Sequence, residues 1–233
     1  RLCTIIRNAF CISLIASQCY TDAMLIIAHR GSRGTHPENT IPALREAITS
    51  GADMIEFDVR LTRDGELVLF HDFHLYRTHK QINIVRSLTL DELQKRTAGS
   101  EYPVVTLRQA LKECVGKLFI NIEVKDRGSG KKTIELLTTE YRKNIKDIMI
   151  SSFSARELGA IRKQNKKIAL AYLQHVNPYA FLAFERSLHL SAVGFHRLHV
   201  PHLAIIAAKK LDMLTYAYTV NRKAAIIQLE DKG

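Results

Sequence analysis

The chain has 233 residues, a formal net charge of +11 and no tryptophan, a length that suits one α/β barrel domain. Its basic residues are spread along the sequence instead of forming a clustered stripe, so we expect no nucleic-acid partner. No apolar run approaches the length that spans a bilayer, which excludes a stable membrane anchor of that kind.

Residues 1–23 are predicted to be an extension outside the folded core. Their short apolar segment, Ala9 to Ala16, could be the centre of a signal peptide, although the cleavage region that follows is poor. The favoured interpretation is upstream sequence translated in frame, with Met24 as the initiator directly before a strand. Beyond this extension only Cys114 remains of the four cysteines, which fits a reducing compartment. We therefore expect a cytoplasmic protein, or an exported one if residues 1–23 act as a signal peptide.

The first predicted elements are a buried strand at residues 24–28 and a helix at residues 41–50. Two apolar runs follow, Met54 to Leu61 and Leu67 to Phe70, with Asp64-Gly65 between them. An Asp-Gly pair between strand-like runs indicates a β-hairpin, and the linker is too short for a parallel crossover. Centring the turn near Asp64 places His71 roughly opposite Asp58.

Residues 74–102 are polar and irregular, with one helix predicted at residues 90–96, and we interpret them as an insertion over the strand ends. Strands and helices then alternate. The further helices are predicted at residues 106–114, 132–143, 155–163, 178–188, 201–210 and 222–229, and the further strands at residues 118–124, 148–152, 168–173, 192–195 and 213–220.

Repeated strand–helix units are typical of a parallel sheet, and counting the hairpin as one position gives seven parallel strands. We therefore predict an α/β fold of the (β/α)8 TIM-barrel type, with a β-hairpin at strand two and a small insertion after it. The pattern stops at residues 231–233, where an eighth strand would begin. We expect that residues 24–233 form a C-terminally truncated barrel domain and that its eighth strand is missing from this chain.

Reactive groups of α/β barrels lie at the C-terminal ends of the strands. The polar residues predicted there are His29, Arg30, Glu56, Asp58, His71, Glu123, Lys125, Thr219 and Asn221. Glu56 and Asp58 are two residues apart and share a face, and buried like charges of this kind need a compensating positive charge. Together with Glu123 they would form a hard oxygen site, which suits Mg²⁺ or Ca²⁺ better than Zn²⁺.

Arg30 and Lys125 would add fixed positive charge beside this site, and the combination suits a phosphate ester. His29 and His71 come from different strands and could act as an acid and base pair near neutral pH. Glu56-x-Asp58 alone could be a salt-bridged structural pair, and Glu123-x-Lys125 alone could be a local ion pair. The hypothesis therefore depends on all of these residues meeting at one end of neighbouring strands. Five other histidines are interpreted as packing or surface residues: His74, His79, His189, His199 and His202. Three remain undecided: His36, His175 and His196.

Short segments spread from Met24 to Asn221 carry a resemblance to a known family. They are His29-Arg30-Gly31, Pro37-Glu38-Asn39-Thr40, Glu56-Phe57-Asp58-Val59, Asp64-Gly65, His71-Asp72, Arg77-Thr78, Asn121-Ile122-Glu123-Val124-Lys125, Ser151-Ser152-Phe153-Ser154 and Tyr218-Thr219-Val220-Asn221. With these segments in this order, the chain resembles the glycerophosphodiester phosphodiesterase family, within the phosphatidylinositol-phospholipase-C-like barrels.

The resemblance implies hydrolysis of small-molecule glycerophosphodiesters to sn-glycerol 3-phosphate and an alcohol. It implies that His29 and His71 are the acid and base. It further implies a divalent metal site at Glu56, Asp58 and Glu123, phosphate binding by Arg30 and Lys125, and an insertion that covers the site and binds the glycerol end. Two departures stand out: the family's last strand has no counterpart after Gly233, and Tyr218 stands where the family often has tryptophan.

Two other functions remain open at this stage. A relative of the family could stop at a cyclic phosphate, and an inactive fragment could only bind phosphorylated ligands or anionic surfaces. Neither the alcohol of the substrate, nor the choice between Mg²⁺ and Ca²⁺, nor the oligomeric state follows from the sequence.

Overall fold

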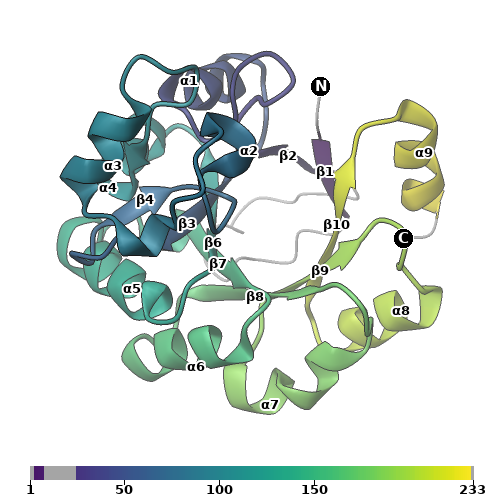
Figure 1. Cartoon of the computed structure of the whole chain (residues 1–233). Helices are drawn as coiled ribbons and strands as arrows, with labels where there is room; N and C mark the ends of the chain where they lie inside the picture. Colours follow the sequence, from purple (N-terminus) through teal and green to yellow (C-terminus); the bar gives the residue numbers. More distant parts are fainter. Residues whose placement is uncertain (1–2, 8–24, 232–233) are drawn as a thin grey trace.

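Parallel strands form the centre of the fold, with helices around them (Figure 1). The computed structural model describes residues 3–7 and 25–231. Within these residues seven strands pair in parallel with their neighbours: β2 (Leu25–His29), β3 (Met54–Leu61), β6 (Phe119–Val124), β7 (Ile148–Ser152), β8 (Ala169–Gln174), β9 (Ala192–His196) and β10 (Leu214–Val220). This arrangement confirms the TIM-type class and the predicted order of strands.

The helices lie outside the strands, as the alternation predicts. They are α1 (Ile41–Thr49), α4 (Leu107–Cys114), α5 (Ser129–Glu140), α6 (Ala155–Gln164), α7 (Glu185–Leu188), α8 (His202–Lys210) and α9 (Lys223–Asp231). Their apolar faces pack on the strands around a core that includes Phe57, Ile122, Leu170 and Phe195. In the described part of the chain no helix is both long enough and apolar enough to cross a membrane.

Two helices differ from their predicted extent. The helix expected at residues 178–188 is a 3-10 turn, η3 (Ala180–Ala183), followed by the single turn of α7. Phe181 and Leu188, on either side of the break at Phe184, are both buried in the core. Helix α5 begins three residues earlier than predicted, directly after Gly128, whose φ of 89° is readily available only to glycine.

The β-hairpin is present, but its register is one residue away from the predicted one. Strand β4 (Leu67–Leu69) runs antiparallel to β3, with Leu69 opposite Val59, and the Phe70 amide donates to the Asp58 carbonyl. His71 is therefore beyond the end of the ladder and not opposite Asp58. The polar turn is centred on Asp64 as expected, and Gly65 adopts the positive φ that such a turn requires.

The insertion after the hairpin forms a small unit with its own apolar cluster. It contains α2 (Tyr76–His79), the 3-10 turn η1 (Val85–Ser87) and α3 (Leu90–Thr97), and it returns through β5 (Val105–Thr106), which pairs with β4. Buried side chains join it to the outer face of the hairpin: Val68, Phe70, Leu75, Val85, Leu88 and Leu93. Thr89 and Glu92 form a capping box that fixes the start of α3.

The N-terminal residues include a strand that the sequence analysis placed outside the core. Strand β1 (Cys3–Arg7) pairs antiparallel with both β10 and β2, at the position that an eighth barrel strand would occupy. Strands β2 and β10 would otherwise leave backbone groups unpaired on their facing edges, and an extended segment satisfies them. The possible signal-peptide segment, Ala9 to Ala16, lies outside the described residues.

Candidate active site

Three carboxylates from two neighbouring strands meet at the carboxyl ends of the sheet. The parallel register of β3 and β6 sets Asp58 beside Glu123, and Glu56 lies two residues before Asp58 on the same face. Each of the three side chains offers an oxygen atom within 4.8 Å of the others. The structure therefore brings together the three acidic residues that the sequence analysis grouped.

Burial and mutual repulsion make it unfavourable to ionise all three carboxyl groups of this acidic cluster. Desolvation and the negative charge of Asp58 raise the pKa of Glu56 well above its usual range, and they raise the pKa of Glu123 to about 7. Burial also acts against ionised Asp58, but Lys125 and Arg30 outweigh it and hold its pKa below the ordinary value. A further positive charge beside the cluster would therefore favour the ionised forms of Glu56 and Glu123.

Two basic residues border the carboxylates. The Arg30 Nε atom lies 3.1 Å from Asp58 Oδ2, and the Lys125 ammonium lies 3.1 Å from Asp58 Oδ1 and 2.5 Å from Glu123 Oε1. Burial opposes both charges, yet the carboxylates more than compensate, and the pKa of each basic group is raised. Both side chains therefore carry fixed positive charge against Asp58.

The loop after β2 holds Arg30 in place through its backbone. Arg30 has a φ of 56° and its amide donates to Glu56 Oε2 at 2.9 Å. Gly31 follows with a φ of 74°, and a Cβ there would lie 2.7 Å from the backbone of Ala43. The loop accordingly needs glycine at this position, and Asn39 closes it by donating to Asp58 Oδ2 at 3.0 Å.

His29 ends β2 beside the carboxylates. Its Nε2 atom lies 3.8 Å from Glu56 Oε2, and its Nδ1 atom lies 3.4 Å from the Thr219 hydroxyl. Burial and the charge of Arg30 lower the pKa of His29 to about 3, so the imidazole is neutral near pH 7. His29 therefore adds no positive charge beside Arg30 at neutral pH.

His71 follows β4 on the other side of the cluster and is part of a short polar chain. Its Nδ1 atom lies 2.6 Å from Asp72 Oδ1, and Asp72 Oδ2 accepts from Arg77 Nε at 2.6 Å. The contact with Asp72 engages Nδ1 and leaves Nε2 as the nitrogen available for chemistry. Burial lowers the pKa of His71, with Lys125 and Arg30 acting in the same direction and Asp58 against them.

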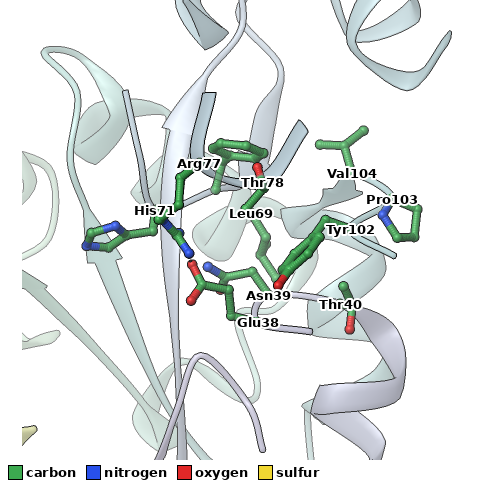
Figure 2. A pocket seen from close by; sticks show the side chains of 11 residues that line it. Glu38, Asn39, Thr40, Leu69, His71, Arg77, Thr78, Tyr102, Pro103 and Val104 are labelled. Atoms are coloured by element: carbon green, nitrogen blue, oxygen red, sulfur yellow. The ribbon is translucent and has the colours of Figure 1, made fainter. Parts of the chain in front are cut away.

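A small recess adjoins His71 between the loop after β2 and the insertion (Figure 2). Figure 2 shows the Arg77 guanidinium directed at Glu38, with which it forms an ion pair, while the His71 ring extends to the side away from Tyr102. Glu38 also binds Arg30 at 3.0 Å. Two of the lining residues thus join the recess to the site, Glu38 through Arg30 and Asn39 through Asp58.

The donor set fits a divalent cation. Glu56 Oε1 is buried and has no hydrogen-bond partner, which is a costly state for a carboxylate oxygen. Within the described residues, the Glu56, Asp58 and Glu123 group is the one set of acidic or imidazole side chains close enough to share an ion. Oxygen ligands alone favour a hard cation such as Mg²⁺ or Ca²⁺.

Some site residues were not assigned a role from sequence. Glu38, Asn39, Asp72 and Arg77 all lie within the motifs quoted above, yet their partners depend on loop geometry that spacing does not reveal. Of the two polar residues expected at the C-terminal end of β10, Thr219 contacts His29, whereas Asn221 is exposed.

A TIM-type barrel with buried carboxylates, a flanking arginine and lysine, and two imidazoles at one mouth defines the class of barrel phosphodiesterases. Comparison with known proteins gives the family: the glycerophosphoryl diester phosphodiesterase family matches residues 29–233. A glycerophosphodiester phosphodiesterase of Caldanaerobacter subterraneus is 32% identical over 219 residues, which cover 85% of this chain and 86% of that protein. The chain belongs to the glycerophosphoryl diester phosphodiesterase family and is an enzyme of that class.

Solved structures agree with this assignment. A phosphodiesterase of Oleispira antarctica, solved in complex with the product sn-glycerol-3-phosphate, matches with a TM-score of 0.78 and 27% identity over 89% of both chains. A glycerophosphodiester phosphodiesterase of Thermotoga maritima matches with a TM-score of 0.77 and 24% identity, over 91% of this chain and 93% of that one, and supports the fold.

Proposed function

We propose that this enzyme hydrolyses glycerophosphodiesters to sn-glycerol 3-phosphate and an alcohol, with a divalent cation bound by Glu56, Asp58 and Glu123. In this proposal Arg30 and Lys125 bind the phosphate, and His29 and His71 transfer the protons. The observation that carries it is the convergence of three buried carboxylates within 4.8 Å, flanked by both basic residues and both imidazoles.

The bound cation would neutralise charge on the phosphoryl oxygens, as Mg²⁺ or Ca²⁺ does in other oxygen-ligand sites. Arg30 and Lys125 supply the remaining positive charge at the same place, and their ion pairs with Asp58 keep them oriented before substrate arrives. The Asn39 amide donates to Asp58 Oδ2, the same oxygen that Arg30 contacts. These residues therefore present a preorganised positive surface to a phosphodiester.

The two imidazoles suit different steps. His29 is neutral near pH 7 and can take the proton from the attacking hydroxyl, whether that belongs to water or to the adjacent glycerol carbon. Burial lowers the pKa of His71, but Asp58 and Asp72 oppose this and favour the imidazolium, and in this proposal the Nε2 atom gives its proton to the leaving alcohol. The Thr219 hydroxyl contacts His29 Nδ1 and helps to orient that ring.

A coupled assay for glycerol 3-phosphate tests the proposal. Several glycerophosphodiesters should be turned over after Mg²⁺ or Ca²⁺ is added to chelator-treated protein, and turnover should stop when chelator is added again. Full turnover in excess chelator would refute the metal requirement. Phosphorus NMR of the same reactions separates direct hydrolysis from release of a cyclic phosphate, which the attack of the glycerol hydroxyl would form.

A further inference from the structure

Four aromatic side chains form a closed circuit at the mouth of the barrel: Phe153, His175, His196 and Tyr218. Going round the circuit, neighbouring ring centroids lie 6.1, 5.3, 6.1 and 6.0 Å apart. Neighbouring ring planes meet at 76°, 63°, 77° and 89°. Each ring is therefore turned steeply against the next, as adjacent walls of a box are.

The circuit follows from the barrel topology. Phe153 directly follows β7, His175 directly follows β8, His196 is the last residue of β9, and Tyr218 lies near the end of β10. Consecutive parallel strands deliver these positions to one face of the barrel. The chain neighbour of Tyr218 is Thr219, which contacts His29, so the circuit adjoins the catalytic centre on the side away from the insertion.

The circuit is both fixed and accessible. The Tyr218 hydroxyl donates to the Gln174 carbonyl at 2.6 Å, which sets the orientation of its ring. Phe153 is 42% exposed, and His175 is exposed as well. A ligand that reaches the mouth from solvent can therefore meet the rings without displacing buried side chains.

The histidines of this region do not form a metal site. Within the described residues, the only acidic or imidazole group close enough to share an ion is the carboxylate cluster across the mouth. Electron-rich ring faces instead attract organic cations, and several rings around one quaternary ammonium make the familiar aromatic cage. Four ring centroids spaced about 6 Å apart in an open square would each lie about 4 Å from its centre, which is within cation–π range.

We propose that this aromatic circuit binds the quaternary ammonium of a choline-type alcohol, so that glycerophosphocholine is a preferred substrate. The inference rests on the proposed function, because it assigns the leaving alcohol to the side of the mouth opposite the insertion. The positive charge of Arg197, the neighbour of His196, works against a bound cation, and it keeps the expected preference moderate.

The first test compares substrates at pH 8, where imidazole side chains are uncharged. The value of kcat/KM for glycerophosphocholine should exceed that for glycerophosphoglycerol by about fivefold or more. Phe153→Leu and His175→Leu, which keep apolar bulk but remove a ring, should each lower this ratio about threefold and leave turnover of glycerophosphoglycerol in place. The matched control is Val176→Ala, next to His175 and 82% exposed, which should keep the wild-type ratio.

The second test needs no turnover. Choline chloride should shift the imidazole NMR signals of His175 and His196 at concentrations at which 3,3-dimethylbutan-1-ol, its uncharged isostere, does not. Equal kcat/KM for both substrates, or equal shifts with choline and its isostere, would overturn the assignment while glycerol 3-phosphate release still stood. Absence of glycerol 3-phosphate from every substrate would refute the proposed function instead, and the NMR comparison would still decide whether the circuit binds a quaternary ammonium.

Discussion

The two sides of the barrel mouth are built on opposite principles. On the side of β2, β3 and β6, buried carboxylates, a guanidinium and an ammonium lie within about one hydrogen-bond length of one another. On the side of β7 to β10, four rings meet at steep angles and are partly open to solvent. The first side is costly to assemble and fixes the chemistry, whereas the second tolerates change and can set selectivity.

The difference also separates stability from function. Three carboxylates held together repel one another, and two of them have raised pKa values because of burial and that repulsion. A bound cation is thus expected to stabilise the charged side, and its removal should lower the stability of the folded protein as well as the rate of turnover. Substitutions on the aromatic side should mainly alter substrate preference.

The largest effect is expected for Glu56→Gln. Loss of this carboxylate should lower metal-dependent turnover about a thousandfold or more, because several kcal/mol of charge stabilisation are lost. The same change should raise the melting temperature of the metal-free protein, since the variant no longer buries a carboxyl group whose ionised form is opposed by desolvation and by the neighbouring carboxylates. Glu135→Gln on the exposed surface of α5 is the matched control. Turnover within tenfold of wild type would exclude Glu56 as a ligand.

The next largest effect is expected for His71→Gln. Removal of a general acid should lower kcat by about 10² to 10⁴ with little change in the melting temperature, because His71 lies beyond the strand ladder and is partly exposed. Steady-state kinetics with glycerophosphoglycerol measure the loss, and His74→Gln on the adjacent insertion serves as the control. A variant that keeps most of the wild-type kcat would show that His71 is not the proton donor.

A pH titration of stability probes the charged side without turnover. Glu123 has a folded pKa of about 7 and a reference pKa of 4.5. Between these values the folded protein binds more protons than the unfolded chain, so the free energy of unfolding falls as pH rises. In chelator the melting temperature should drop from pH 5 to pH 8, and Glu123→Gln should flatten this slope. A wild-type profile as flat as that of the variant would contradict the raised pKa.

The smallest effect is expected for Tyr218→Phe on the aromatic side. The substitution keeps the ring and removes only the hydrogen bond to the Gln174 carbonyl, which should cost about 1 kcal/mol of stability. Urea unfolding with an unchanged m-value measures it. A loss of more than about 3 kcal/mol in the free energy of unfolding would mean that the aromatic side tolerates substitution no better than the charged side does.

Much of the charged side was predictable because strand periodicity is simple. Glu56-x-Asp58 and Glu123-x-Lys125 each fix which side chains share a face, and the barrel rule places them at one end of neighbouring strands. The pairing of Asp58 with Glu123 then needed only the correct order of strands. Loop contacts were not predictable in this way: the position of Asn39 depends on a φ of 58° that spacing does not reveal.

The predictions that were wrong also depend on local geometry that residue spacing does not reveal. The predicted hairpin register was wrong by one residue because the loop between Leu61 and Leu67 is centred on Asp64 itself, which sets Phe70 and not His71 opposite Asp58. The helix expected at residues 178–188 is broken at Phe184, and periodicity does not reveal this break because Phe181 and Leu188 are seven residues apart and would share one face of a continuous helix. A sequence pattern does indicate the aromatic circuit, because its four rings recur every 21 or 22 residues, once for each strand–helix unit.

Glu38 joins two parts of the chain that have no strand pairing between them. Its carboxylate contacts Arg30 of the loop after β2 and Arg77 of the insertion, and Arg33 lies 3.9 Å away. A fluctuation that lifts the insertion must therefore break this shared anchor or pull on the loop that orients Arg30. Amide hydrogen exchange in α2 and in residues 30–40 should then open as one cooperative unit, and Glu38→Gln should uncouple the two.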